Sequence, residues 1–199
     1  EFMAGVCNCD IHLTDKLAIY AEEVRRGLEI EIVPPCMNRS LAAFSVKDQK
    51  LVYGLAALKN VGAEAMQLIV TGREDKPFAT LFDIARCVDL KRIGKRPLEM
   101  LARSGAFDQL DTNRRKVFDS LDGLVAYSAA IHEQRNSNQV SLFGEAGEDL
   151  PEPRLSPVGD WLPAERLEEE HKDIGFYLSG HPLDDYLPAL KRKKALTLE

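Results

Sequence analysis

The stretch 53–72, YGLAALKNVGAEAMQLIVTG, decides the fold because it holds two helical segments around a tight break. Its apolar residues recur at helical spacing, which predicts a short helix first and a second helix through about Val70. Between them, 59–62 contains a glycine and interrupts the pattern. The stretch therefore predicts a helix, a turn and a helix in quick succession.

The same layout recurs further along the chain. Thr80 and Asp83 have the spacing of a capping box, which predicts a helix that begins there and runs to about Val88. A second glycine break falls at 92–95, and a further helix should end near Gly105. The two units resemble each other in layout more than in residue identity.

Breaks of this kind can bind phosphate. The first N–H groups of a helix have no partner inside the helix, and the helix dipole favours an anion there. Gly62 has no Cβ, so a phosphate can approach the backbone closely. A single unit is better explained as a packing corner, but two in tandem favour a duplex held through its phosphates. The expected contacts are Lys59, Asn60, Val61, Gly62, Ala63, Lys91, Arg92, Gly94, Lys95 and Arg96.

The residues before these units predict a small mixed segment. An amphipathic helix is expected over 14–27, with Thr14 as its N-cap and Gly27 as a left-handed stop. Alternating residues then predict a short strand over 29–33 and a hairpin that turns at 47–50. The fold class is therefore mainly α with a small β element near the N-terminus.

The residues after them predict more helix. One apolar stripe runs from 113 to about 133 and indicates a long helix. Helical patterning resumes after residue 160, with the glutamates 168–170 expected to face outward. The side chains expected to face inward there are Leu162, Leu167 and Ile174.

The charge is unevenly distributed. A formal net charge of −6 argues against a uniformly basic nucleic-acid-binding protein. Yet residues 86–118 contain nine bases and four acids, whereas 144–173 contain three bases and ten acids. Because a local basic patch can hold a polyanion while the rest of the chain stays acidic, residues 86–118 are the better candidate for nucleic-acid contact.

A polar stretch at 134–160 has the composition of a flexible linker, yet it contains QVSLFGE at 139–145. Two interpretations of its Leu142 and Phe143 remain open. They anchor in the pocket of a partner, where their burial would contribute roughly 3–6 kcal/mol before ordering costs, or they fold back onto this chain.

Metal-binding and catalytic patterns are weak. Cys7, Cys9 and His12 fall short of the four ligands of a structural zinc site, and Cys36 and Cys87 lack nearby companions. A zinc-dependent hydrolase built on the first three is the least favoured hypothesis. No nucleophile elbow, P-loop or His-Glu-x-x-His motif occurs, and no run of the sequence reaches the length of a membrane span. The expectation is a reduced cytoplasmic protein with no catalytic residues and no metal site.

Four segments together carry a resemblance: YGLAALKNVG, LFDIARCVDLKRIGKRPLEMLARSGAFD, QVSLFG and IGFYLSGHPLDDY. In this order they resemble the C-family of bacterial replicative polymerases, the DNA polymerase III alpha subunits. EFMAGVCNCDIHLTDKLAIYAEEVRR is similar to the end of that family's fingers domain. The first residue is not Met, and the expectation is a fragment of a longer polypeptide.

The resemblance implies four parts. Residues 1–50 would be the end of the fingers, and 51–133 the tandem helix-hairpin-helix DNA-binding domain with the long helix after it. Residues 134–160 would be a flexible linker with the sliding-clamp motif, and 161–199 a helical segment that precedes an OB-fold region. The second hairpin departs from the usual pattern, because it has one glycine where two are typical. The clamp contacts would be Gln139, Val140, Ser141, Leu142 and Phe143.

The implied role is processive chromosomal replication. The partners would be double-stranded DNA, the sliding clamp (beta subunit) and, through the parent chain, other replicase subunits, with no membrane. The fragment would have no cofactor and no nucleotidyltransferase activity, because the Mg²⁺-binding aspartates of the parent DNA-directed DNA polymerase would precede residue 1. The alternative is a protein-interaction scaffold without DNA binding.

Overall fold

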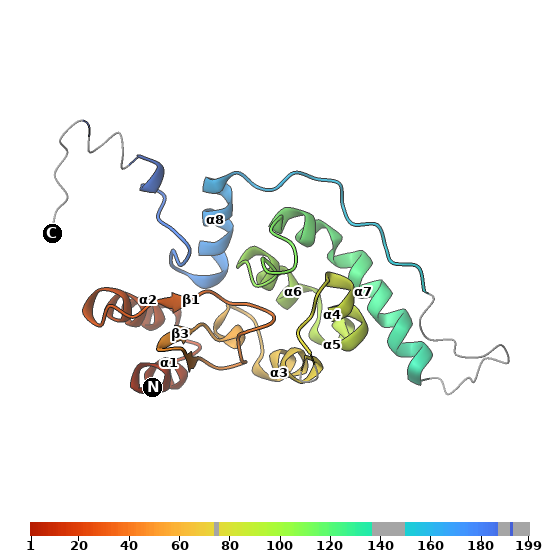
Figure 1. Cartoon of the computed structure of the whole chain (residues 1–199), viewed down its shortest axis with the longest axis horizontal. Coiled ribbons are helices and arrows are strands. Elements are labelled where there is room, and N and C mark those ends of the chain that lie inside the picture. The colour runs from red at the N-terminus through yellow and green to blue at the C-terminus, as the bar shows by residue number, and fades with distance from the viewer. Residues whose placement is uncertain (74–75, 137–149, 187–191, 193–199) are drawn as a thin grey trace.

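Helix α8 (Pro163–Ile174) stands between two groups of elements in the computed structural model (Figure 1). The structure describes residues 1–73, 76–136, 150–186 and 192. On one side of α8 lie α1 (Phe2–Cys9), α2 (Thr14–Glu22) and a small sheet, and on the other lie the helices from α3 to α7. The predicted fold class, mainly α with a small β element near the N-terminus, is confirmed.

The sheet has three short strands in the order β1-β3-β2. Strands β2 (Ser45–Lys47) and β3 (Lys50–Val52) form the predicted hairpin, in which Asp48 and Gln49 adopt φ values of 51° and 60°. These left-handed values fit a two-residue turn that matches the twist of the strands. Strand β1 (Ile32–Val33) pairs in parallel with β3.

Both predicted ends of the helix over 14–27 are wrong. Helix α2 begins at Thr14 as the first helical residue, with Leu13 in the N-cap position, and continues into a π-helical turn, η1 (Glu23–Gly27). The N–H of Leu28 donates to the carbonyl of Glu23, so the chain passes through Gly27 without a left-handed turn. The left-handed residue is Glu29, with φ 53°.

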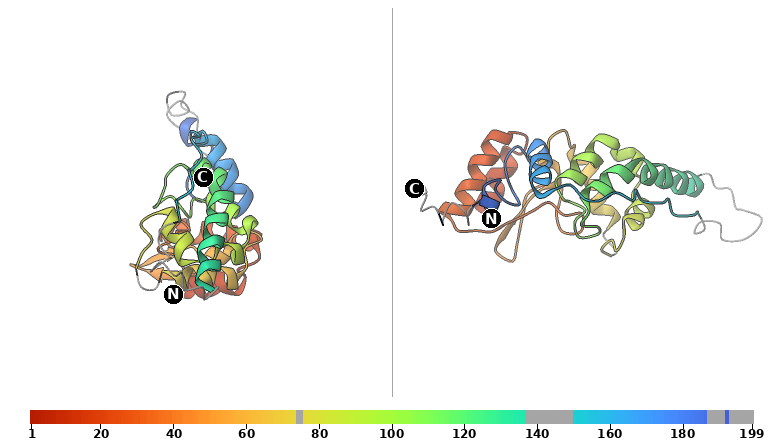
Figure 2. Two further views of the ribbon diagram at one scale, coloured as in Figure 1. Left: turned by 90° about the vertical axis from the view of Figure 1, so that its right-hand side faces the viewer. Right: turned by 90° about the horizontal axis from the view of Figure 1, so that it is seen from above.

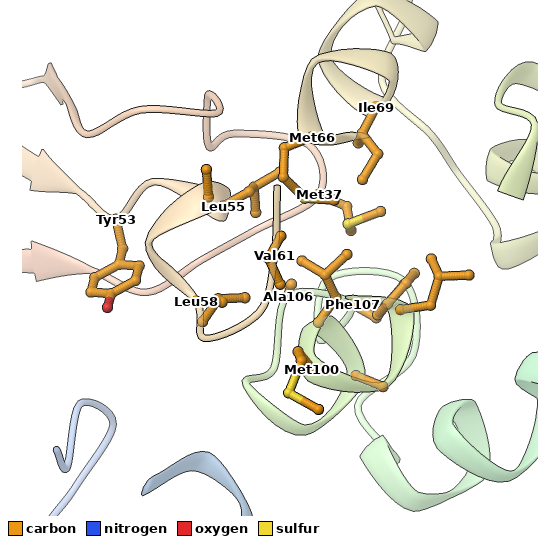
Figure 3. Packing of buried hydrophobic residues seen from close by; sticks show 14 of the residues in the cluster. Met37, Tyr53, Leu55, Leu58, Val61, Met66, Ile69, Met100, Ala106 and Phe107 are labelled. Atoms are coloured by element: carbon orange, nitrogen blue, oxygen red, sulfur yellow. The ribbon is translucent and has the colours of Figure 1, made fainter. Parts of the chain in front are cut away.

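The first helical unit consists of a 3₁₀ turn, η2 (Leu55–Ala57), and helix α3 (Ala63–Gly72). The expected first helix is thus a single turn. Met66 and Ile69 of α3 are fully buried, and Figure 3 shows them in one cluster with Val61 and Phe107. Burying two such side chains contributes roughly 3–6 kcal/mol, so this cluster fixes the turn before α3.

The second unit consists of α4 (Leu81–Cys87), α5 (Leu90–Ile93) and α6 (Lys95–Arg103). The predicted capping box is confirmed, because the N–H of Asp83 donates to Thr80 Oγ1 at 3.1 Å and the N–H of Thr80 donates to Asp83 Oδ2 at 2.8 Å. Helix α5 is an additional short helix before the break. Helix α7 (Arg114–Asn136) packs against all three helices and is the predicted long helix.

Residues 150–162, which we call the return segment, run back along α7 (Figures 1 and 2). Asn113 donates to the carbonyl of Val158 at 2.8 Å, and the N–H of Ser156 donates to Ser120 Oγ at 2.8 Å. The prediction of a flexible linker therefore does not hold for 150–160, where the backbone finds its partners on α7.

Helix α8 is held by buried ion pairs, which corrects part of its predicted orientation. Glu170 is 1% exposed and pairs with Arg114 at 3.2 Å, although 168–170 were expected to face outward. Arg114 also pairs with Asp108 at 2.8 Å. Ile174 is buried as predicted, but Leu162 is 67% exposed because it precedes the first turn of the helix.

Candidate nucleic-acid interface

The first hairpin comprises η2, the turn 58–62 and α3. Its turn is built by Asn60, which has φ 59°, and by Val61, which is 5% exposed and anchors the turn in the core. Gly62 is the N-cap of α3 in an extended conformation, with φ −82° and ψ 140°. No side chain caps this helix, so the N–H groups at its start remain open to an external acceptor.

The fold of this chain does not require glycine at position 62. A Cβ at this position would have no heavy atom within 4 Å, and the φ value suits any residue. The missing side chain therefore leaves open space in front of the first amides of α3. That space is what a phosphate oxygen needs to reach the backbone.

Lys59 is more constrained than the sequence indicates. Its N–H donates to the carbonyl of Asp173 at 3.1 Å, and its Nζ donates to the carbonyl of Lys172 at 3.2 Å. Both acceptors belong to the last turn of α8, where the helix dipole favours a cation. Lys59 thus attaches the first hairpin to α8, and its ammonium lies at the edge of the hairpin.

The second hairpin comprises α5, Gly94 and α6. Gly94 has φ 90° and ψ 153°, a conformation open only to glycine at low cost, and its N–H donates to the carbonyl of Leu90. Lys95 and Arg96 follow in the first turn of α6 and are exposed. Because Pro97 has no N–H, the start of α6 offers fewer backbone donors than the start of α3.

Side-chain charge at the second hairpin is concentrated on two arginines. Lys95 pairs with Asp122 at 2.7 Å, and Lys91 pairs with Glu133 at 3.4 Å. Arg92 and Arg96 are exposed and, within the part of the chain that the structure describes, make no ion pair. These two guanidinium groups are the ones left to meet an anion.

Most other bases of 86–118 serve the fold. Arg103 pairs with Asp173 at 2.8 Å, Arg86 with Glu152 at 2.5 Å, and Arg114 is buried against Asp108 and Glu170. Burial acts to lower the pKa of Arg114, but the bonds to Asp108 and Glu170 outweigh it and raise the pKa. The basic count of this stretch therefore overstates the positive charge on its surface.

The two hairpins are neighbours. Helix α3 contacts α5, and a hollow of about 460 Å³ between them is lined by Glu64 at the start of α3 and by Arg92 of α5. His132 of α7 closes this hollow, and its Nε2 is buried without a partner. The tandem arrangement thus brings the beginning of α3 close to the second hairpin, as a grip on one duplex requires.

Cys7, Cys9 and His12, which the least favoured hypothesis combines in a zinc site, differ in their exposure. Cys7 is buried, and burial raises its pKa to about 11, which disfavours the thiolate that binds metals. Cys9 and His12 are exposed. Among the described residues, no group of three or more His, Cys, Asp or Glu side chains is arranged to hold a metal ion, and no helix is long and apolar enough to cross a membrane.

The predicted clamp contacts at 139–143 lie outside the described residues. The described chain ends at residue 136 and resumes at residue 150, and Arg86 contacts a residue on each side of this interval. Its carbonyl accepts from Arg135 Nη1 at 2.7 Å, and its Nη2 donates to Glu152 Oε1 at 2.5 Å. The ends of α7 and of the return segment are thus attached to the same residue of α4.

Comparison with known proteins gives one consistent result. Residues 29–117 match the family model for the helix-hairpin-helix motif. The whole chain is 39% identical to DNA polymerase III subunit alpha of Caulobacter vibrioides, of which it covers 17%. Over 96% of its length it is 34% identical to the subunit of the same name from Vibrio cholerae, and over its whole length it is 32% identical to that of Campylobacter jejuni, again covering 17% of each. The chain therefore spans about a sixth of the length of these curated relatives.

Proposed function

This chain belongs to the DNA polymerase III subunit alpha family, and we propose that it is the part of such a polymerase that grips duplex DNA behind the active site and reaches the sliding clamp. The observation that carries the proposal is the tandem hairpin pair inside the helix-hairpin-helix match, with uncapped amides at α3 and, at the second hairpin, two arginines that form no ion pair with any described residue.

The grip divides between the hairpins. At the first, the amides that follow Gly62 supply donors without side-chain charge, so any phosphate is accepted whatever base it carries. At the second, Arg92 and Arg96 supply charge-assisted hydrogen bonds that compensate for the amide missing at Pro97. Both modes address the sugar-phosphate backbone and give binding without sequence preference.

Salt dependence tests this proposal. Each neutralised phosphate should change the slope of log affinity against log salt by about 0.9. The double variant Arg92→Gln, Arg96→Gln should therefore lower the slope of duplex binding by about 1.8 in a fluorescence anisotropy titration. Arg39→Gln, Lys47→Gln removes the same charge from two exposed bases elsewhere and should leave the slope near that of the wild type. Equal salt slopes for the two double variants would contradict the assignment of Arg92 and Arg96 as phosphate contacts.

Clamp binding is the second half of the proposal and rests on the sequence at 139–143. Leu142 and Phe143 would enter an apolar pocket of the clamp, with Gln139 at its rim. The variant Leu142→Ala, Phe143→Ala should lose clamp binding in a titration with purified beta subunit, while its duplex affinity stays that of the wild type. Unchanged clamp affinity would contradict the assignment.

In this proposal the segment contributes binding and not nucleotidyl transfer. The Mg²⁺-dependent chemistry belongs to the parent polymerase, whose palm domain supplies the metal-binding aspartates. A cytoplasmic location fits a role at the replication fork.

One observation favours a different function. Six of the nine bases in 86–118, all except Arg92, Arg96 and Arg115, form an ion pair with an acid that lies more than four residues away in this chain. Such internal pairing is expected if the hairpins only pack. A protein-interaction scaffold of that kind would not retard a duplex at low salt. The same titration, begun at about 50 mM salt, distinguishes the two functions.

A further inference from the structure

The first hairpin shares a hollow with a turn from the N-terminal segment. The turn is 10–13, between α1 and α2, and the hollow measures about 470 Å³. The lining comprises Ile11, His12 and Thr14 on one side and residues 56–62 on the other. The surface beside the first hairpin is therefore built from two segments that lie far apart in the sequence.

The 10–13 turn is held rigidly. The N–H of Leu13 donates to the carbonyl of Asp10 at 2.8 Å, and the carboxylate of Asp10 accepts from Tyr20 at 2.7 Å and from Lys16 at 3.0 Å. These bonds, that of Tyr20 first and that of Lys16 next, lower the pKa of Asp10. Asp10 is thus engaged within the turn, and His12 is left exposed at its tip.

Gly175 keeps the turn and the hairpin at a fixed separation. It ends α8 with φ 95°, and a Cβ there would collide with Thr14 Cγ2 and come within 3.3 Å of Lys59 Nζ. Thr14 begins α2 beside the turn, and Lys59 belongs to the hairpin. Gly175 thus lies against one residue from each side of the hollow and leaves room for them to approach each other.

The hollow is basic. Of the described residues that line it, the titratable ones are His12 and Lys59, and none is an acid. His12 and Lys59 also line an adjoining hollow, where Asp15 and Lys16 are their charged neighbours, and Glu64 lines the hollow on the side of α5. Lys172, whose carbonyl accepts from Lys59, pairs with Glu168 and Glu169. Protonation of His12 therefore adds a second cation to a hollow whose own lining contains no acid, while Asp15 and Lys16 beside it offset each other in charge.

We infer that His12 is a further contact to the DNA backbone: a phosphate next to the one held by the first hairpin lies across this hollow and accepts from the protonated imidazole. The inference rests on the proposed function and adds to the grip a residue outside the helix-hairpin-helix match. Because the contact needs the protonated form of the imidazole, duplex binding should strengthen as the pH falls.

The test compares the wild type with His12→Gln at pH 6 and at pH 8, by fluorescence anisotropy with a labelled duplex over a range of salt. At pH 6 the variant should bind roughly twofold to fivefold more weakly, the effect of one exposed ionic contact, and its salt slope should be smaller by about 0.9. At pH 8 the two proteins should agree. His181→Gln removes another exposed histidine and should behave like the wild type at both values.

Two results would contradict a contact between His12 and the DNA backbone. Equal slopes for wild type and His12→Gln at pH 6, or an equal loss in His181→Gln, would overturn the inference. If the wild type binds duplex and depends on Arg92 and Arg96 but not on His12, the inference alone fails. If the wild type does not bind duplex at low salt, the proposed function fails with it. A merely structural role for His12 would weaken binding equally at both pH values.

Discussion

Replacing Glu170 by alanine should cost the folded chain about 3–5 kcal/mol, the range observed when one partner of a buried ion pair is removed. Glu170 lies in α8 and is 1% exposed. Its carboxylate accepts from Arg114 Nη1 at 3.2 Å and from the N–H groups of Leu178 and Ser179 at 2.9 and 2.8 Å. Alanine leaves all three donors without this acceptor.

The geometry sets the size of the effect. The N–H of Leu178 is buried, and leaving it without an acceptor costs about 1–3 kcal/mol, whereas Ser179 is exposed and its N–H can bond to water. Arg114 keeps its contact with Asp108 at 2.8 Å, and the side chain of Asp108 is 35% exposed, so the arginine charge retains a partner and access to water. The total therefore stays near 3–5 kcal/mol and does not reach the sum for three isolated buried groups.

Urea denaturation followed by far-ultraviolet circular dichroism measures this change. Glu168→Ala is the matched control, because Glu168 is 70% exposed and its ion pair with Lys172 should contribute less than about 1 kcal/mol. Glu170→Gln should fall between the two, since an amide oxygen can still accept from the backbone. Loosening α8 should also speed hydrogen exchange at Lys59, whose N–H bonds to α8. If Glu170→Ala had the same free energy of unfolding as Glu168→Ala, the reasoning would be refuted.

Four further results are expected. Burial raises the pKa of Asp173 more than Arg103 lowers it, so the carboxyl group binds its proton more tightly in the folded state than in the unfolded state. The stability of the wild type relative to Asp173→Asn should therefore fall as the pH rises from about 4 through the raised pKa. A difference in urea midpoints that does not change with pH would contradict this. Thr80→Ala should lose about 1 kcal/mol in the same assay and Thr80→Ser little, because serine keeps the cap. Gly94→Ala should lose about 1–2 kcal/mol, since φ 90° is strained for alanine, and normal stability would disprove that strain. Gly62→Ala should be at least as stable as the wild type yet bind duplex more weakly in anisotropy, because its side chain would fill only the space reserved for phosphate; unchanged affinity would argue against that space.

Local signals predicted local structure well. The capping box at Thr80 and the turn at 47–50 were predicted because each depends on residues within a few positions of one another. The glycine break before Lys95 was predicted for the same reason, since φ 90° is a property of one residue. Gly27 is the exception, because the π-helical turn carries the chain past it to Glu29.

Contacts between residues far apart in the chain could not be predicted from the sequence. Glu170 sits in a run of three glutamates, and only its meeting with Arg114, distant in the chain, makes it a core residue. The same holds for the parallel pairing of β1 with β3 and for the backbone of 150–160, whose partners lie on α7. In the candidate site, the sequence identified both hairpins, but Lys59, Lys91 and Lys95 have internal partners that no pattern indicates. Nor could spacing reveal that His12 shares a hollow with the first hairpin.

The return segment has a mechanical consequence. It runs antiparallel to α7 (Figure 2), and its bonds to Arg86 of α4, to Ser120 of α7 and to Asn113 just before α7 are distributed along its length. A load applied at Leu150 and directed away from the helices pulls along the segment, so these bonds resist together in shear and do not peel one after another. Tension from any molecule attached at 137–149 would therefore be shared between α7 and α8, the two helices on which the placement of both hairpins depends.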